Sequence, residues 1–250
     1  MLQSGFAHPN ELLSSLPTDQ LDRLMLYMMP ESISQGTVLI EAGDEVDFVY
    51  FPHSGMVSLL DVLADGRAIE TETVGREGVL GAMAGLGSPV SLVRVIVQIG
   101  IETSKIAARR FQQIAGESEA IRALCIHQND VLLSKARVTA ACNAVHEVEA
   151  RFCRWILQTV DHAGGDVAEL TQEFLAEMLG VRRTSVTEVA GKVQRSGAIA
   201  YSRGTIKIQD RQKLEGMSCD CYARQKEHGL ILARTYIARQ KAREAASERL

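Results

Sequence analysis

From Arg182 to Glu188 the chain carries cationic and short polar side chains at nearly every position. Guanidinium and hydroxyl groups of this kind bind phosphate oxygens and the edges of bases in a major groove. We therefore predict a nucleic-acid contact surface in this segment and at three flanking residues. Its members are Thr171, Arg182, Arg183, Thr184, Ser185, Thr187, Glu188, Lys192 and Arg203.

Residues 172–191 have the pattern of two helices that cross at a tight turn. Ala176 lets the helices approach closely, and Gly180 can take a left-handed turn conformation without steric strain. The shared apolar core is predicted to hold Leu175, Leu179, Val181, Val186 and Val189. An ordinary antiparallel helix pair is the alternative, but it does not require glycine, alanine and a polar N-terminal turn in one register.

A short hairpin is predicted directly after the helix pair. Apolar residues alternate with smaller or polar ones over 199–201 and 206–208, on either side of the turn residues 202–204. Two helices followed by such a hairpin make a winged helix. Arg203 at the hairpin tip either contacts a phosphate or is simply solvated.

Positive charge is concentrated in the same region. The whole chain has a formal net charge of −4, but residues 178–209 hold six basic residues against the single acid Glu188. Nonspecific attraction to DNA phosphates should therefore be confined to this module.

Composition indicates a cytoplasmic protein without a membrane anchor. Acids at positions 11, 19 and 22 distinguish the first 30 residues from an export signal, and no apolar run reaches the about 20 residues of a membrane span. The five cysteines are an odd number in helical or tail segments, so we expect no disulfide framework. No catalytic set of nucleophile and base can be assembled, so we expect no enzyme.

Residues 31–108 have the pattern of an antiparallel sandwich or roll. Short apolar runs over 37–40, 48–51, 57–60 and 93–97 are separated by glycine-containing turns. The glycine-rich segment 75–89 could hold a phosphate by its backbone N–H groups. Glycines that only allow tight turns are an equal alternative.

A long helix follows, with a seven-residue repeat that begins at Ile121. Such a stripe favours pairing with a second copy, while packing against its own domain is the alternative. The predicted dimerisation residues are Ile121, Leu124, Gln128, Val131, Lys135, Val138 and Cys142. In a dimer, two recognition helices could enter successive major grooves about 34 Å apart.

The order of these parts resembles the Crp/Fnr family of bacterial transcription regulators over about residues 15–215. The motifs that carry the resemblance are residues 36–44, 50–51 and 55 in the roll and residues 170–176 and 179–186 near the C-terminus. The resemblance implies an α+β chain with an antiparallel β-roll sensor domain, of the cyclic-nucleotide-binding-like jelly-roll type, over 1–116. A dimerisation helix over 117–145 and a winged helix-turn-helix over 146–216 would follow, with a basic helical tail over 217–250 beyond the usual end of the family.

The resemblance also implies roles for single residues. Arg183 aligns with the residue that opens the recognition helix, Thr184, Thr187 and Glu188 fall at base-reading positions, and Ser185 matches a phosphate contact. Glu188 departs from better-known members, which carry arginine there, so the operator should differ from the familiar one. The partners implied are double-stranded DNA, a second copy of the chain and RNA polymerase.

The roll departs from the cyclic-nucleotide binders of the family. The glutamate and arginine that hold the ribose and the cyclic phosphate are not evident, so a buried phosphate would lack its cationic partner. Gly78, Gly81 and Arg94 are the residues left for a pocket that binds an unknown effector. The N-terminal cysteine cluster of the oxygen-sensing branch is also missing, because the first cysteine is Cys125. A haem ligand is conceivable only at His53.

In the tail, Cys219 and Cys221 could bind a soft metal together with His228, but a solvated or buried thiol pair is favoured. We therefore expect no metal and no cofactor. The function predicted is a sequence-specific DNA-binding transcription regulator that acts as a dimer, with a roll that senses an unknown signal or has lost ligand binding. The alternative is a small-molecule-binding or cupin-like enzyme roll whose winged helix serves protein contacts.

Overall fold

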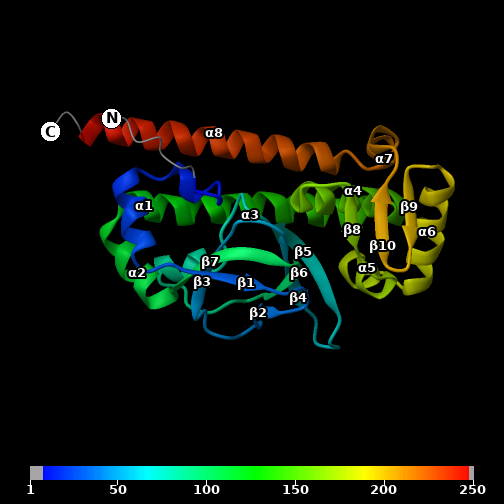
Figure 1. Cartoon of the computed structure of the whole chain (residues 1–250), viewed down its shortest axis with the longest axis horizontal. Coiled ribbons are helices and arrows are strands. Elements are labelled where there is room, and N and C mark those ends of the chain that lie inside the picture. Colours follow the sequence, from blue (N-terminus) through cyan, green and yellow to red (C-terminus); the bar gives the residue numbers. More distant parts are fainter. Residues whose placement is uncertain (1–7, 248–250) are drawn as a thin grey trace.

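The structure is a computed structural model that describes residues 8–247. A β-roll and a winged helix are joined by one long helix, and a second long helix runs back along the first (Figure 1). The fold is α+β, as the sequence predicts. None of the helices in the described part combines the length and the apolar character of a membrane span.

Two antiparallel sheets form the roll. The first has the order β1-β7-β3, with β1 (Met29–Ile33), β7 (Ile101–Ala107) and β3 (Phe48–Pro52). The second has the order β2-β6-β4-β5, with β2 (Val38–Ile40), β6 (Arg94–Ile99), β4 (Met56–Val62) and β5 (Ala68–Val74). Val49 and Phe51 of the first sheet share one buried core with Val57 and Val97 of the second.

Four short helices cover this roll: η1 (Leu13–Ser15), α1 (Thr18–Met25), η2 (Ala82–Leu86) and α2 (Ala108–Glu117). The glycine-rich segment contains η2, and Gly81 and Gly87 at its ends take left-handed conformations with φ of 76° and 90°. A side chain on Gly85 would collide with Phe111, since its Cβ would lie 2.6 Å from the ring. Gly81 and Gly87 therefore allow tight turns, and Gly85 allows close packing.

Helix α3 (Glu119–Val145) begins after Ser118, whose hydroxyl accepts a hydrogen bond from the N–H of Ile121 at 3.2 Å. Ile121 and Leu124 lie in the core of the roll. Further along, the Nζ atom of Lys135 lies 3.3 Å from Glu72 and donates to the carbonyl of Thr73 at 3.1 Å. The repeat therefore marks the face by which α3 docks on its own chain.

This packing corrects the predicted dimerisation surface. Five of its residues, Ile121, Leu124, Gln128, Val138 and Cys142, are buried within the single chain. The other two, Val131 and Lys135, are half-buried. A seven-residue repeat identifies the covered face of a helix but not what covers it. Here the roll and the C-terminal segment cover it.

The winged helix is built from α4 (Val148–Ala163), β8 (Val167–Glu169), α5 (Gln172–Leu179), α6 (Arg183–Arg195), β9 (Ile199–Ser202), β10 (Thr205–Ile208) and α7 (Arg211–Met217). Its three strands have the order β8-β10-β9. Apolar residues of α4, α5 and α6 share one core with Met56 and Leu60 of the roll, so the two parts are packed together.

Helix α8 (Cys221–Ser247) lies antiparallel to α3 along much of its length (Figure 1). Gln225 donates a hydrogen bond to Thr139 at 3.1 Å, and Tyr236 stacks on His127 with ring centroids 4.5 Å apart. The tail predicted over 217–250 is therefore helical over 221–247. It packs along α3, and its first two turns also contact α4, where Lys226 lies 2.8 Å from Asp161. Residues 248–250 of that prediction, and residues 1–7 of the predicted sensor domain, lie outside the described residues.

A buried carboxyl group connects the roll to the winged helix. Glu70 of β5 accepts hydrogen bonds from Trp155 Nε1 of α4 at 2.6 Å and from the hydroxyl of Ser58 at 2.5 Å. Burial raises the pKa of Glu70 to about 7, although both hydrogen bonds act in the opposite direction. The carboxyl thus binds its proton more tightly in the folded chain than in the unfolded chain, whose reference pKa is 4.5.

This difference predicts a pH-dependent stability. Between about pH 4.5 and 7 the unfolded chain releases the proton first, so the free energy of unfolding falls as pH rises and stays reduced above that window. Glu70→Gln keeps an acceptor for Trp155 and removes the titration. We expect it to stabilise the fold by about 1–3 kcal/mol at about pH 8 and to change little at about pH 5. Urea unfolding of both proteins at the two pH values measures this.

Glu227→Gln, at an exposed position of α8, is the control and should change stability little at either pH. If Glu70→Gln destabilises the protein equally at both pH values, the carboxyl does not hold its proton in the folded state.

Candidate nucleic-acid interface

The helix-turn-helix is formed by α5 and α6. Thr171 precedes α5 and its hydroxyl accepts a hydrogen bond from the N–H of Phe174 at 3.2 Å, which caps the helix. Gly180 ends α5 in a left-handed conformation with φ of 64°. The turn then leads through Arg182 into α6, in the way the sequence predicts.

Most of the predicted contact residues on α6 face solvent. Arg182, Arg183, Thr184, Thr187 and Glu188 are exposed, as is Lys192 two turns into the helix. Ser185 is half-buried and lines a cavity of about 610 Å³ between the helix-turn-helix and residues 66–69 of the β4–β5 hairpin. The first turns of α6 are thus open to a large ligand, with Ser185 beside the roll.

Acidic residues of the same module hold two of the predicted contact cations. Arg183 lies 2.6 Å from Glu173 of α5, and Lys192 forms an ion pair with Glu149 of α4. Thr187 donates a hydrogen bond to the side chain of Gln172 at 2.8 Å. The positive field is therefore weaker than the count of basic residues suggests.

The wing brings a further cation to this surface. Ser202 pairs with Thr205, so Arg203 and Gly204 form a two-residue turn, with φ of 51° and 80°. Thr171, Arg183 and Arg203 line one surface hollow of about 410 Å³. Residues from α5, α6 and the wing that the sequence placed far apart therefore lie together.

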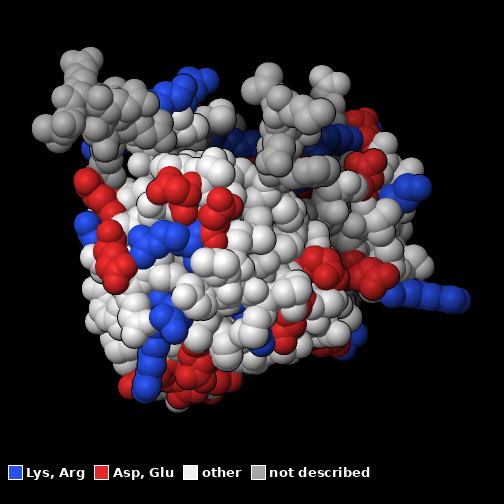
Figure 2. Space-filling model, turned by 60° about the vertical axis from the view of Figure 1, so that its left-hand side comes forward, with Lys and Arg blue, Asp and Glu red and all other residues white. Residues whose placement is uncertain are grey.

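The face of the molecule shown in Figure 2 has no large area of a single charge. Acidic and basic side chains are interspersed with wide neutral areas on the face that Figure 2 presents. This face belongs to the end of the molecule that carries the roll.

A second cavity, of about 200 Å³, opens in the roll beside η2 and α3. Its lining is mainly apolar, with polar side chains from Ser88, Ser91, Gln128 and Asn129. Gly81 lines this cavity, whereas Gly78 lies against Gln128. Arg94 is a correction: it forms an ion pair with Glu41 at 2.8 Å and does not line the cavity.

The conceivable haem ligand, His53, has ordinary partners. Its Nε2 atom lies 3.1 Å from the hydroxyl of Ser104, and its ring meets that of His8 edge-on at 5.1 Å. These contacts agree with the ordinary role of a hydrogen-bonded histidine.

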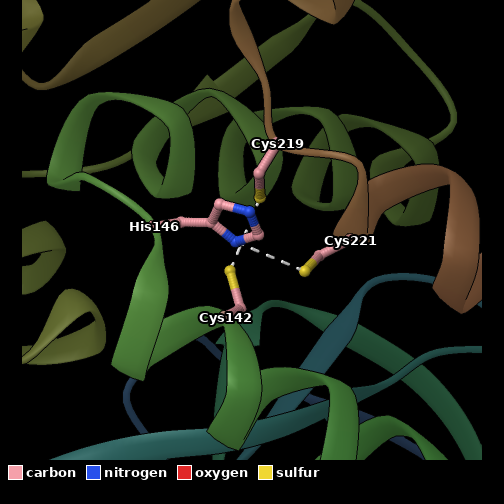
Figure 3. Close-up of side chains that lie close together, drawn as sticks. All are labelled: Cys142, His146, Cys219 and Cys221. Atoms are coloured by element: carbon pink, nitrogen blue, oxygen red, sulfur yellow. Dashed lines mark hydrogen bonds between the residues drawn. The ribbon is translucent and has the colours of Figure 1, made fainter.

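The cysteines of the tail have partners that the sequence analysis missed. Cys219 and Cys221 lie beside Cys142 and His146 at the end of α3 (Figure 3). His228 instead contacts Ser134, about two turns before Cys142 on α3. Hydrogen bonding with Cys219 lowers the pKa of Cys142. Cys142 and His146 are four residues apart at the end of a predicted helix, a spacing that could have been recognised. The seven-residue repeat instead assigns Cys142 to the dimerisation stripe.

Comparison with known families matches both parts of the chain. Residues 30–118 match the cyclic nucleotide-binding domain, and residues 150–217 match the Crp-like helix-turn-helix domain. Helix α8 lies beyond both matches. No curated protein matches the chain.

Several solved structures share the fold at low identity. FixK2 from Bradyrhizobium japonicum is 15% identical over 77% of this chain and 98% of its own, with a TM-score of 0.66. The c-di-GMP responsive global regulator CLP from Xanthomonas campestris is 20% identical over 77% and 99%, with a TM-score of 0.63. A transcriptional regulator of the CRP family from Thermus thermophilus, TTHB099, is 18% identical over 75% and 96%, with a TM-score of 0.64.

The two matched domains, their order and the shared fold together identify the protein family. A cyclic nucleotide-binding type of roll precedes a Crp-like helix-turn-helix, with a long helix between them. The chain belongs to the Crp/Fnr family of transcription regulators.

Proposed function

We propose that the chain is a sequence-specific DNA-binding regulator that acts as a dimer on a two-fold symmetric operator. The observation that carries this proposal is the exposed N-terminal half of α6, with Arg183, Thr184, Thr187 and Glu188 open to solvent. Thr184, Thr187 and Glu188 recur at helical spacing, so they share one face that can enter a major groove.

Each polar group has a chemical role in this proposal. Arg183 donates to guanine, and the carboxylate of Glu188 accepts from the amino group of cytosine. Thr171 and Arg203 border the same hollow and contact phosphates on either side of the groove. To donate to guanine, the guanidinium of Arg183 must leave its ion pair with Glu173.

The dimer in this proposal uses a face of α3 other than the predicted stripe. Ile126 and Leu133 lie seven residues apart on α3, with 50% and 44% of their surface exposed. Apolar residues at this spacing on one helix suit pairing with the same helix of a second copy. A two-fold axis at this face would present two recognition helices to one duplex.

The signal proposed for the roll is a small and largely apolar molecule. The cavity beside η2 has no basic residue among its lining residues, and its volume is about 200 Å³. A cyclic phosphate would leave its charge without a cationic partner there. RNA polymerase remains a partner expected from the family. The cupin-like alternative gains no support, since the metal-ligating group found among the described residues lies at the end of α3 and not in the roll.

Selection of bound sequences from random duplexes tests this function with the purified full chain and no additives. We expect a two-fold symmetric consensus whose half-sites are separated by about one helical turn, roughly 34 Å or a multiple of it. A consensus that appears only with cell metabolites would make the roll a ligand-gated sensor. A consensus without symmetry would contradict the dimer, and no enrichment under any of these conditions would contradict DNA recognition.

Arg183→Ala should weaken specific binding by about 1–3 kcal/mol per half-site and relax one base position, because bidentate readout of guanine is lost. Glu173→Gln should instead strengthen specific binding, since it releases Arg183 and removes one negative charge beside the DNA. Fluorescence anisotropy with the selected operator, at several salt concentrations, measures both changes.

Arg23→Ala is the matched control, because Arg23 forms an ion pair of the same 2.6 Å length with Glu117 on the roll. It should leave operator affinity unchanged. An unaltered base preference in Arg183→Ala would remove this arginine from the residues that read sequence.

Leu133→Asp should convert the dimer to a monomer, because a carboxylate would be buried in an apolar interface without a partner. Sedimentation equilibrium measures the mass, and affinity for the full operator should fall by more than about tenfold. Leu26→Asp, at a position after α1 that is 77% exposed and away from the cavity of the roll, is the control. A Leu133→Asp protein that remains dimeric would show that the two copies meet elsewhere.

A further inference from the structure

Four side chains with metal-ligating atoms converge where α3 ends and α8 begins. Cys142 comes from the last turn of α3 and His146 is the residue after that helix, while Cys219 lies two residues before α8 and Cys221 is its first residue (Figure 3). Their three Sγ atoms and one imidazole nitrogen all lie within 4.8 Å of one another. The three thiols are buried, and His146 is half-buried.

The distances agree with the edges of a tetrahedron around one ion. With zinc–sulfur bonds of about 2.3 Å, two ligand sulfurs stand about 3.8 Å apart, and sulfur and nitrogen stand about 3.6 Å apart. The Sγ atoms of Cys142 and Cys219 are 3.5 Å apart, and Cys221 Sγ lies 3.6 Å from His146 Nδ1. The side chains therefore need little movement to bind an ion at their centre.

The surroundings have the features of an outer shell. Nε2 of His146 lies 3.4 Å from the carboxylate of Asp220, which favours the tautomer whose Nδ1 lone pair faces the thiols. Arg151 and Arg154 are buried nearby, and their charges interact with the thiol of Cys142. In the described structure the Nε atoms of both arginines lack a hydrogen-bond partner. Three thiolates and a neutral imidazole around a divalent ion carry one net negative charge, which these guanidinium groups would offset.

We propose that Cys142, His146, Cys219 and Cys221 bind one thiophilic divalent ion, Zn²⁺ in the first place, in a closed tetrahedral site. Thiolate and imidazole are the ligands that zinc prefers, and four protein ligands leave no open position for a substrate. The site is therefore structural, and it fixes α8 to the end of α3.

Two other uses of these thiols fit the geometry less well. A disulfide requires sulfur atoms about 2.05 Å apart, and it would use two of the cysteines and leave His146 and the third without a role. The cysteines are free in the structure. A cluster of several iron atoms is wider than a single ion and is held mostly by four cysteines. A set of four atoms within 4.8 Å encloses one ion.

The position of the ligands gives the ion a specific mechanical effect. The segment that matches the Crp-like helix-turn-helix domain, residues 150–217, lies between the two ligand pairs along the chain. An ion bound by all four side chains would join the two ends of this domain to each other and to α3. Cys219 and Cys221 lie beyond the family match, so this clamp is a property of this chain's tail.

The test begins with the full chain purified without a polyhistidine tag and in the presence of a reductant. Elemental analysis should find about one equivalent of zinc per chain. Replacement by Co²⁺ should give the intense ligand-field bands of a tetrahedral ion and a charge-transfer band from thiolate to cobalt. These spectra test the site in the wild-type protein, without a variant that might fail to fold.

Variants then assign the ligands. Cys142→Ser, His146→Ala, Cys219→Ser and Cys221→Ser should each lower the affinity for Co²⁺ by more than about 100-fold. Asp220→Asn should lower it by about 10–100-fold and keep the tetrahedral spectrum, because it only orients His146. Cys125→Ala and Cys153→Ala, at buried cysteines outside the group, are the matched controls and should bind the ion normally.

Three results would overturn the proposal. One is a reduced wild-type chain that binds neither Zn²⁺ nor Co²⁺ at equimolar concentration. Another is cobalt bound with an octahedral spectrum and no thiolate band, and the last is a folded Cys142→Ser protein with unchanged affinity. An iron–sulfur chromophore would likewise replace the single-ion site.

Discussion

The docking of α3 on the roll determines where every other part of the molecule lies. Lys135 is mostly buried on α3, and its ammonium lies between Glu72 and Glu77 of the roll, at 3.3 and 3.5 Å. Burial alone would lower the pKa of Lys135, but the two carboxylates outweigh it and raise the pKa. Because a buried charge without a partner is strongly destabilising, α3 cannot slide along the roll without losing this pairing. The register of the helix is therefore fixed, and with it the position of His146 and α4 at its end.

The sequence was most informative where local chemistry alone decides the structure. Gly180, Ala176 and the polar first turn of α6 predict the helix-turn-helix, because turn conformation and close approach depend on residues adjacent in the chain. It was least informative about partners. The repeat from Ile121 correctly marks a covered face, yet hydrophobic spacing is the same whether a roll, a tail or a second copy covers it. The correction at Arg94 has the same origin, since its ion pair with Glu41 depends on how two strands align.

The cysteine–histidine group also depends on contacts that the sequence does not reveal, here between residues far apart in the chain. Cys219 and Cys221 are recognisable as a possible ligand pair, and so are Cys142 and His146, but the 72 residues between the pairs conceal that they meet. His228 is the nearest histidine in the sequence to these two cysteines, so it is the predicted third ligand. In the structure α8 runs antiparallel to α3, so positions near the start of α8 meet the end of α3, and His228 lies almost two turns further along beside Ser134. Because the helices are antiparallel, the histidine that joins the cysteines is His146 and not His228.

Ser185 connects the predicted DNA-binding surface to the rest of the molecule. The other predicted contact residues on α6 are exposed, but Ser185 lines the cavity against the β4–β5 hairpin, and Gly180 lies beside Ile69 of that hairpin. A phosphate bound by Ser185 would have to enter this cavity, or the winged helix would have to move away from the hairpin. Such a movement would be opposed by the hydrogen bond from Trp155 to Glu70 on the side of the roll. An ion at Cys142, His146, Cys219 and Cys221 would oppose it at the N-terminal end of α4. The winged helix is thus held at two points, one sensitive to protonation and the other to metal, and both lie outside the residues that contact DNA in the proposed complex.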